Sequence, residues 1–460
     1  MLFVDDLGYG DLGFTGHPTT QTPNIDALAH GGRVLSTWYS GCPVCSGSRA
    51  ALMTGRQFAR IGVPGVFSPT GNTGLPLNET TAAQQLKQAN YATAIVGKWH
   101  LGQRSMYLPG ARGFDRYLGI PYSDDMGEAR DYLPLVKQMG DGKTTNTTIL
   151  EQPLDFSALA QHYSDFATVR PLDDSRILRQ ARLASSDSST IVGTFIKDNK
   201  ENPFFLYMPF RCDMAVSPHS TLAAMSSSSL KLTRLDSHVH TTAANQPEKQ
   251  YAGCQFKNTS RRGMFGDALA EVDWQVGEIM STLKEQGLEN NTLVLFASDN
   301  GPWMIQNASA GSEGLFTGRT SNYWNTGKGS TWEGGIRMPA FAYWPNVVPA
   351  TTRTPEMVSS LDFVPTISRL AGVPLPSDRI YDGRDMLDVL LGNGTTPHET
   401  LFFYRDQSGP MAMRYGPWKA HFRTAPGLGG CNQPDCHTKT YNPPLLFNVE
   451  VCPYFLAWFA

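Results

Sequence analysis

A cysteine and an arginine four residues apart form the pattern in this sequence with the clearest chemical meaning. Cys45 and Arg49 lie in the segment CSGSRAALMTGR, residues 45–56. The small polar residues between them favour a helix N-cap, and the alanines and leucine that follow are good helix formers. We therefore expect Cys45 at the amino-terminal end of a helix, where backbone N–H groups bind anions and lower the pKa of a thiol. Such a position suits a nucleophile that meets a tetrahedral oxyanion.

Four oxygen donors follow two apolar segments that are predicted to be strands. Asp5 and Asp6 follow the first segment, and Asp299 and Asn300 follow the second. Each pair alone also fits an ordinary loop, where Asp and Asn are common. Three carboxylates brought together would repel one another, and one would take up a proton unless a cation lay between them. Because hard cations prefer such oxygen ligands, we predict a Ca²⁺ or Mg²⁺ site with Cys45 beside it.

These segments together closely resemble the sulfatase family, nearest to its arylsulfatase A and steroid sulfatase branch. Around the oxygen donors, the strings VDDLGYGD and ASDNG carry the resemblance. The resemblance as a whole extends over about residues 1–210 and 237–448. It implies an alkaline phosphatase-like fold and hydrolysis of sulfate monoesters. It also implies that a formylglycine-generating enzyme oxidises Cys45 to formylglycine. The metal ligands that it implies are Asp5, Asp6, Cys45, Asp299 and Asn300.

The resemblance gives further residues a role at the sulfate group. Lys98 and His100 lie in VGKWHLG, Lys328 in TGKGSTWEGG and Ser123 in IPYSDD. The two lysines and the serine match sulfate contacts, and His100 matches the partner of the formylglycine hydroxyl. On sequence alone, a lysine beside a tryptophan also fits a surface charge, and Ser123 fits an ordinary turn.

A histidine is the natural acid for the leaving oxygen, because its unperturbed pKa lies near working pH. His240, in SHVHTT, matches the family's histidine that binds the substrate and protonates the leaving oxygen. The alternative interpretation is an ordinary loop histidine. His238 is a second candidate, and we treat His219 as incidental. In the mechanism that the resemblance implies, a formylglycine hydroxyl attacks sulfur, and the metal and Arg49 favour the alkoxide form of that hydroxyl. His240 protonates the departing alcohol. His100 then takes a proton from the second hydroxyl, and sulfate leaves.

Gly47 departs from the family motif, which is Cys-x-Pro-x-Arg, sometimes with Ala in place of Pro. The modifying enzyme reads this motif in an unfolded chain. Glycine is more flexible than proline, so we expect weaker recognition and partial conversion of Cys45.

Strands and helices alternate along the first three quarters of the chain. This alternation predicts an α/β fold with a mostly parallel central sheet and helices on both faces. Ligand sites in such sheets lie beyond the carboxyl ends of the strands. The expected strands are Leu2–Val4, Ala92–Val96, Pro203–Phe210 and Leu293–Ala297; the expected helices begin at Thr22–Pro23 and cover Thr81–Gln88 and 265–283.

We expect a catalytic domain over residues 1–380 and a smaller, incomplete α+β unit with an antiparallel sheet over 381–460. Hairpin strands are predicted on either side of Gly416–Pro417. Residues 211–236 resemble an insertion, which is either a mobile loop or a gene-model error. The string CPYFLAWFA after residue 451 resembles a premature end, and the start of the first strand and a signal peptide are expected to be missing.

Composition sets broad limits on function. The chain has 460 residues, of which 40% are hydrophobic and 17% are charged, as in an ordinary globular protein. Its net charge of −3 provides no positive electrostatic potential that would attract nucleic acid. No apolar run is long enough for a transmembrane segment. The seven cysteines form no disulfide framework, although Cys431 and Cys436 are close enough for a local bridge. Cys42 and Cys45 form one CxxC, but the second ligand pair of a zinc site is missing.

Six Asn-x-Ser/Thr sequons fit a lysosomal or secreted glycoprotein; they begin at Asn78, Asn146, Asn258, Asn290, Asn307 and Asn393. The natural sulfate ester and the oligomeric state, a homo-oligomer included, stay open. Two other functions also stay open. One is a catalytically inactive or mis-spliced homologue, and the other is a phosphatase or phosphodiesterase, against which Cys45 and the shortage of metal-spaced histidines count.

Overall fold

The computed structural model describes residues 1–126, 132–140, 145–156, 159–167, 195–210, 214–215, 249–250, 252–253, 255–316, 325–428 and 437–450. Several predicted features lie outside these residues. They are His219, His238 and His240, the cysteines Cys431 and Cys436, the tail from residue 451, and most of the proposed insertion 211–236. Within the insertion the structure describes only β9 (Met214–Ala215), which pairs with β10 (Lys249–Gln250).

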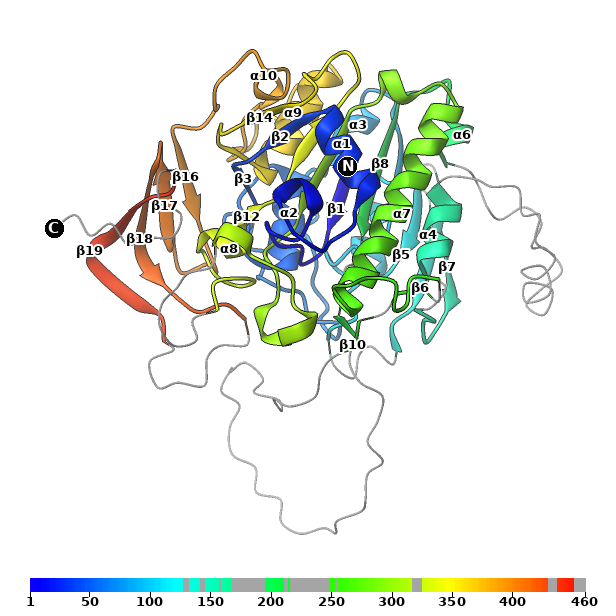
Figure 1. The fold of residues 1–460 in the computed structure, drawn as a ribbon. Coiled ribbons are helices and arrows are strands. Elements are labelled where there is room, and N and C mark those ends of the chain that lie inside the picture. Colours follow the sequence, from blue (N-terminus) through cyan, green and yellow to red (C-terminus); the bar gives the residue numbers. More distant parts are fainter. Residues whose placement is uncertain are drawn as a thin grey trace, which may run out of the picture.

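A ten-stranded sheet forms the centre of the molecule, in the order β14-β2-β13-β11-β1-β8-β4-β5-β6-β7 (Figure 1). Its middle strands run parallel to one another: β11 (Val294–Ser298), β1 (Leu2–Val4), β8 (Phe204–Phe210), β4 (Ala92–Val96) and β5 (Arg116–Gly119). At one edge, β13 (Phe341–Tyr343) pairs antiparallel with β11 and with β2 (Arg33–Leu35), and β14 (Thr352–Thr354) pairs parallel with β2. At the other edge, β6 (Leu135–Gly140) pairs antiparallel with β5 and with β7 (Thr145–Glu151).

Side chains alternate between two hydrophobic cores along each middle strand. In β1, Leu2 and Val4 belong to one core and Phe3 belongs to the other. The first core is covered by α1 (Pro23–Gly31), α4 (Leu159–Ala167), α6 (Phe195–Asp198) and α7 (Met264–Glu285). The second is covered by α2 (Cys45–Thr54), α3 (Ala82–Lys87), α9 (Phe363–Leu370) and α10 (Leu387–Leu390). The predicted α/β fold with helices on both faces is therefore confirmed.

A separate four-stranded antiparallel sheet lies near the carboxyl-terminal end, at the side of the molecule (Figure 1). Its strands are β16 (Thr400–Phe403), β17 (Ala412–Tyr415), β18 (Trp418–Thr424) and β19 (Lys439–Asn448). Gly416 has a φ of 52° in the turn between β17 and β18, as the predicted hairpin requires. Leu401, Phe403 and Ala412 pack on the three-stranded sheet of β12 (Arg337–Met338), β3 (Trp38–Tyr39) and β15 (Val358–Ser359) and its neighbours.

A buried ion cluster joins this sheet to the rest of the chain. Glu333 begins α8 (Glu333–Ile336) and accepts a hydrogen bond from Lys419 Nζ at 2.7 Å and one from the Tyr39 hydroxyl at 2.8 Å. Burial would raise the pKa of Glu333, but Lys419 and Arg337 outweigh it and lower the pKa to about 2. Glu333 therefore stays charged inside the protein, beside an ammonium group whose side chain is only 1% exposed. In the described parts of the chain, no helix is long and apolar enough to cross a membrane.

Replacing Lys419 with methionine should destabilise the fold strongly, because it leaves the Glu333 carboxylate buried without its closest cation. We expect Lys419→Met to lower the free energy of unfolding by about 3–5 kcal/mol. Arg369→Met is the matched control, since Arg369 is 48% exposed in its pair with Asp385 and such pairs contribute about 0–1 kcal/mol. Urea unfolding measures both variants. Equal losses of unfolding free energy would show that the buried pair contributes no more to stability than the exposed one.

Candidate active site

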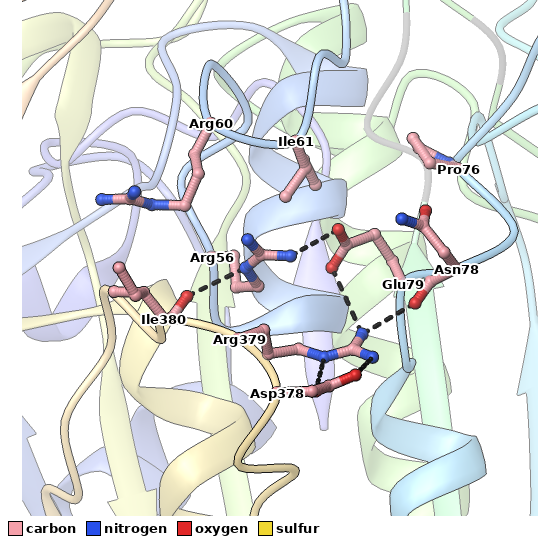
Figure 2. A pocket seen from close by; sticks show the side chains of 9 residues that line it. All are labelled: Arg56, Arg60, Ile61, Pro76, Asn78, Glu79, Asp378, Arg379 and Ile380. Atoms are coloured by element: carbon pink, nitrogen blue, oxygen red, sulfur yellow. Dashed lines mark hydrogen bonds and ion pairs between the residues drawn. The ribbon is translucent and has the colours of Figure 1, made fainter.

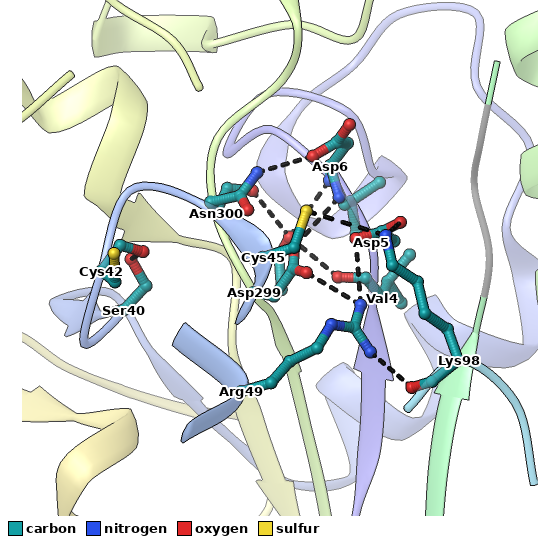
Figure 3. Close-up of polar contacts among 12 residues, drawn as sticks. Val4, Asp5, Asp6, Ser40, Cys42, Cys45, Arg49, Lys98, Asp299 and Asn300 are labelled. Carbon is teal, nitrogen blue, oxygen red and sulfur yellow. Dashed lines mark hydrogen bonds and ion pairs between the residues drawn. The ribbon is translucent and has the colours of Figure 1, made fainter. Parts of the chain in front are cut away.

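The candidate residues gather where the parallel strands end. Asp5 and Asp6 follow β1, Asp299 and Asn300 follow β11, and Lys98 follows β4 by two residues. Because neighbouring parallel strands end at the same edge of a sheet, residues almost 300 positions apart become neighbours. Figure 3 shows these side chains converging from the strand ends and from α2, which supplies Cys45 and Arg49.

Helix α2 starts at Cys45, so the expected position of the cysteine at a helix amino terminus is correct. The expected serine cap is wrong. Val44 occupies the N-cap position without a side-chain hydrogen bond, and Ser46 lies in the first turn. There its hydroxyl accepts a hydrogen bond from the backbone N–H of Phe67 at 3.1 Å. Tertiary contact with residues 65–67 therefore replaces the local cap that the sequence suggested.

Arg49 lies fully buried between two of the carboxylates. Its Nη2 donates to Asp5 Oδ1 at 2.9 Å and to Asp299 Oδ2 at 2.8 Å, and its Nη1 donates to the backbone oxygen of Lys98 at 2.9 Å. One guanidinium thus connects the ends of β1 and β11 with the loop after β4. Charged hydrogen bonds of this kind are short and strong.

Both candidate lysines contact the aspartates. Lys98 Nζ lies 2.6 Å from Asp5 Oδ2 and 3.7 Å from Cys45 Sγ. Lys328 Nζ lies 2.6 Å from Asp6 Oδ2. Both ammonium groups are almost completely buried, so the positive charge that would meet an anionic substrate lies within the site itself. Lys98 is therefore not the surface charge that the sequence left open.

Burial, reinforced by the neighbouring carboxylate of Asp5, raises the pKa of two of the aspartates. Burial, followed by the charge of Asp5, raises the pKa of Asp299 well above its usual range, and burial raises that of Asp6 against the pull of Lys328. For Cys45 the prediction was wrong. Burial raises the pKa of its thiol well above the usual value, although Lys328 and Lys98 act in the other direction. Loss of water around the thiolate outweighs the helix end and the two cations.

His100 and Ser123 are also buried near these charges. Burial and the charge of Lys98 lower the pKa of His100 to about 3, so its imidazole is neutral at working pH. Its Nε2 lies 3.3 Å from the backbone oxygen of Phe67, and among the described residues its Nδ1 has no hydrogen-bond partner. A neutral imidazole with a free ring nitrogen can accept a proton.

The donor set fits a divalent cation. One ligand atom each from Asp5, Asp6 and Cys45 lies within 4.8 Å of the others. Asn300 donates through Nδ2 to Asp6 Oδ1 at 2.6 Å, whereas its buried Oδ1 has no partner in the described part of the chain. Carboxylate oxygens with an unsatisfied amide oxygen beside them are suitable ligands for Ca²⁺ or Mg²⁺.

Two residues at the site were not predicted. Asp125 Oδ2 lies 3.6 Å from Lys328 Nζ, and Lys328 Nζ lies 4.9 Å from the centre of the Trp303 ring. Asp125 carried a usable signal, because it is an acid in the loop after a parallel strand, as Asp5 and Asp299 are. Trp303 carried none, since an aromatic residue in a loop has no preferred partner in sequence.

Comparisons with known proteins match this arrangement. A family model described as Sulfatase matches residues 1–373, and one described as the C-terminal region of aryl-sulfatase matches residues 396–454. This chain belongs to the sulfatase family. It is 36% identical to arylsulfatase A of Homo sapiens over 478 residues, which cover 98% of this chain and 81% of the relative. It is 33% identical to steryl-sulfatase of Rattus norvegicus, with 98% and 83% covered.

A solved sulfatase has the same fold. The crystal structure of PsFucS1 sulfatase from Pseudoalteromonas sp. superposes with a TM-score of 0.72 at 27% identity, covering 98% of this chain and 83% of that one. The predicted resemblance to sulfatases, and to the arylsulfatase and steroid sulfatase branch within them, is confirmed. The chain is a sulfatase, a hydrolase of sulfate esters.

The sulfatase also contains a charged surface pocket away from the strand ends (Figure 2). It has a volume of about 610 Å³ and none of the candidate site residues line it. Its three arginines are already paired: Arg56 with Glu79, Arg60 with Asp382 at 2.8 Å, and Arg379 with Asp378 at 2.7 Å. The pocket residues are Arg56, Arg60, Ile61, Pro76, Asn78, Glu79, Asp378, Arg379 and Ile380.

Packing explains why this sulfatase has glycine at position 47. A Cβ atom placed there would overlap Cys42 Sγ and lie 2.9 Å from Cys42 Cβ and 3.2 Å from Phe58 Cγ. The backbone N–H of Gly47 also donates to the Gly65 oxygen at 3.0 Å, a bond that proline cannot make. Cys42 and Cys45 are both free and buried thiols, so the CxxC pair is not a disulfide in the structure.

A double-mutant cycle tests this packing. Gly47→Ala should destabilise the protein by about 1–3 kcal/mol, because the new methyl group has no room beside Cys42. In the Cys42→Ala background the same change should cost less, with a coupling energy of about 0.5–3 kcal/mol. Denaturant unfolding of the four proteins gives the coupling, and strictly additive effects would contradict the proposed competition for space.

Proposed function

We propose that this sulfatase hydrolyses sulfate monoesters with the oxidised side chain of residue 45 as nucleophile and a divalent cation beside it. The observation that carries the proposal is the position of Cys45. It begins α2 in a buried cluster, with Asp5, Asp6 and Lys98 around its sulfur. The supporting names are those of the relatives, which include an arylsulfatase and a steryl-sulfatase.

The two lysines answer the main obstacle to this reaction. A sulfate ester resists nucleophiles because its anionic oxygens repel them, and buried cations that are already in place lower this barrier without reorganisation. Lys98 and Lys328 are held by Asp5 and Asp6 at 2.6 Å. We assign them to the sulfate oxygens. Ser123, buried in the loop after β5, is assigned to the same group.

The cation would be held by Asp5, Asp6, Asp299 and Asn300 together with the modified residue 45. When bound, it would withdraw charge from the sulfate oxygens and from the hydroxyl of residue 45. Arg49 already donates to two of these carboxylates, so we assign it to orienting them and to balancing their charge.

Proton transfers fall to histidines in this proposal. His100 is neutral, and its unpartnered Nδ1 can accept a proton from a hydroxyl of residue 45. We keep His240, which lies outside the described residues, as the acid for the leaving alcohol. A catalytically inactive homologue would not need a buried nucleophile, oxygen donors and two lysines in one place, so activity is the better explanation.

Exposed glycosylation sites favour a secretory route, in a lysosome or outside the cell. Five of the six sequon asparagines have described side chains, and all five are exposed. Aryl and steroid sulfates are the substrate classes that the relatives' names support.

Mass spectrometry of residue 45 tests the nucleophile. In protein made by eukaryotic cells, we expect an aldehyde on the tryptic peptide that contains it and release of sulfate from p-nitrophenyl sulfate. Cys45→Ala should reduce that hydrolysis by a factor on the order of 10³ or more, because the nucleophile is gone. Cys42→Ala, which removes the neighbouring buried thiol, should leave the rate within about threefold. Full hydrolysis by protein with only a thiol at residue 45 would refute the proposal.

Calcium binding should stabilise the protein and restore its activity after chelation. At a free Ca²⁺ concentration of 100 Kd, the gain in unfolding free energy is about 2.7 kcal/mol. Asp6→Asn should abolish most of this gain, whereas Asp385→Asn, in a surface ion pair, should keep it. Thermal unfolding with and without Ca²⁺ gives the comparison. If Ca²⁺ stabilised both variants equally, the result would contradict a cation site at the strand ends.

A further inference from the structure

An unpredicted carboxylate accompanies Lys328. Asp125 comes from the loop after β5, and its Oδ2 lies 3.6 Å from Lys328 Nζ. The side chain of Asp125 is 16% exposed and that of Lys328 is 3% exposed, so little water lies between them. Burial raises the pKa of Asp125, but Lys328 and Lys98 outweigh it and the pKa falls below its usual value. Asp125 is therefore a fixed negative charge beside a lysine that we assign to the sulfate.

This carboxylate is unusual in an anion-binding site, because it repels the ligand that its neighbour attracts. Asp6 alone already pairs with Lys328 at 2.6 Å, so Asp125 is not needed to neutralise the lysine in the described structure. Trp303 packs against the same ammonium group and helps to fix its position. The negative charge of Asp125 therefore needs an explanation beyond packing.

The charge balance of the site provides one. Ion pairs join three cations, Arg49, Lys98 and Lys328, to four carboxylates. The carboxylates are those of Asp5, Asp6, Asp299 and Asp125. A divalent cation would leave this group with one net positive charge, and without Asp125 it would have two. A sulfate monoester carries one negative charge, whereas a phosphate monoester of the same shape carries two above its second pKa of about 6.

We propose that Asp125 is a specificity-determining residue, which limits the positive charge around Lys328 so that the site prefers a singly charged sulfate ester to a doubly charged phosphate ester. This inference rests on the proposed function. It deepens that function by naming the group that rejects the competing class of substrate. Specificity is a difference between two affinities, and a repulsive charge is an efficient way to set it.

Binding of a matched pair of esters tests the proposal without any turnover. Phenyl sulfate and phenyl phosphate are titrated by calorimetry at pH 7.5, with saturating Ca²⁺, into Cys45→Ala protein and into the same protein with Asp125→Asn. Asp125→Asn keeps the shape of the side chain and removes its charge. We expect the phosphate ester to gain about tenfold more affinity than the sulfate ester, because an added unit of charge acts twice as strongly on a dianion.

Two controls separate charge from structure. Asp125→Glu keeps the charge and should leave the affinity ratio within about twofold, and Asp378→Asn removes a charge that is 67% exposed in the pocket of Figure 2 and should do the same. An equal Ca²⁺-dependent rise in melting temperature shows that each variant is folded. If Asp125→Asn cannot be obtained folded, Asp125→Ser takes its place.

Three results would overturn the proposal. The first is an unchanged affinity ratio in Asp125→Asn. The second is weaker binding of both esters by that variant, which would mean that Asp125 only holds Lys328 in place. The third is that the parent Cys45→Ala protein binds neither ester. These results do not depend on oxidation of residue 45. Failure of the proposed function would appear separately, as protein that carries the aldehyde and yet releases no sulfate.

Discussion

The arginine that lies between Asp5 and Asp299 is the interaction on which the rest of the site depends. Two carboxylates at the ends of adjacent parallel strands are out of reach of water, and burying these charges would cost the fold several kcal/mol for each one left without a partner. Arg49 bonds to both and also to the backbone of Lys98. It thereby fixes helix α2 against the sheet. The position of Cys45, one turn earlier on the same helix, follows from that anchor.

The same requirement for balanced charge explains where the lysines are. Asp5 and Asp6 each have an ammonium group at 2.6 Å, from Lys98 and from Lys328 respectively. Burial therefore gives the site two properties together. It fixes a set of charges that can hold a cation and an anion, and it raises the pKa of the Cys45 thiol. A neutral thiol is a weak nucleophile, and this supports the proposal that residue 45 reacts in its oxidised form.

The carboxyl-terminal sheet supports the loop that carries Lys328. The backbone N–H of Leu428 donates to the Lys328 oxygen at 2.6 Å, and the N–H of Gly329 donates to the Pro43 oxygen at 2.7 Å, close to Cys45. Lys419, from β18, holds the Thr331 oxygen and Glu333 a few residues further on. The backbone at Lys328 is thus held from two sides, by Pro43 just before α2 and by Leu428 in the segment after β18.

The sequence by itself determined the elements and most of the chemistry. Apolar runs that end in Asp or Asn predicted β1 and β11 with their oxygen donors, because a buried strand needs hydrophobic residues and its end does not. The strings around Cys45, Lys98 and Lys328 predicted the family. Only the tertiary structure decided what surrounds each group. Asp125 beside Lys328, Cys42 in the space next to Gly47, and the raised pKa of Cys45 all depend on contacts between distant segments and on the exclusion of water. Local patterns of residue types carry no record of either.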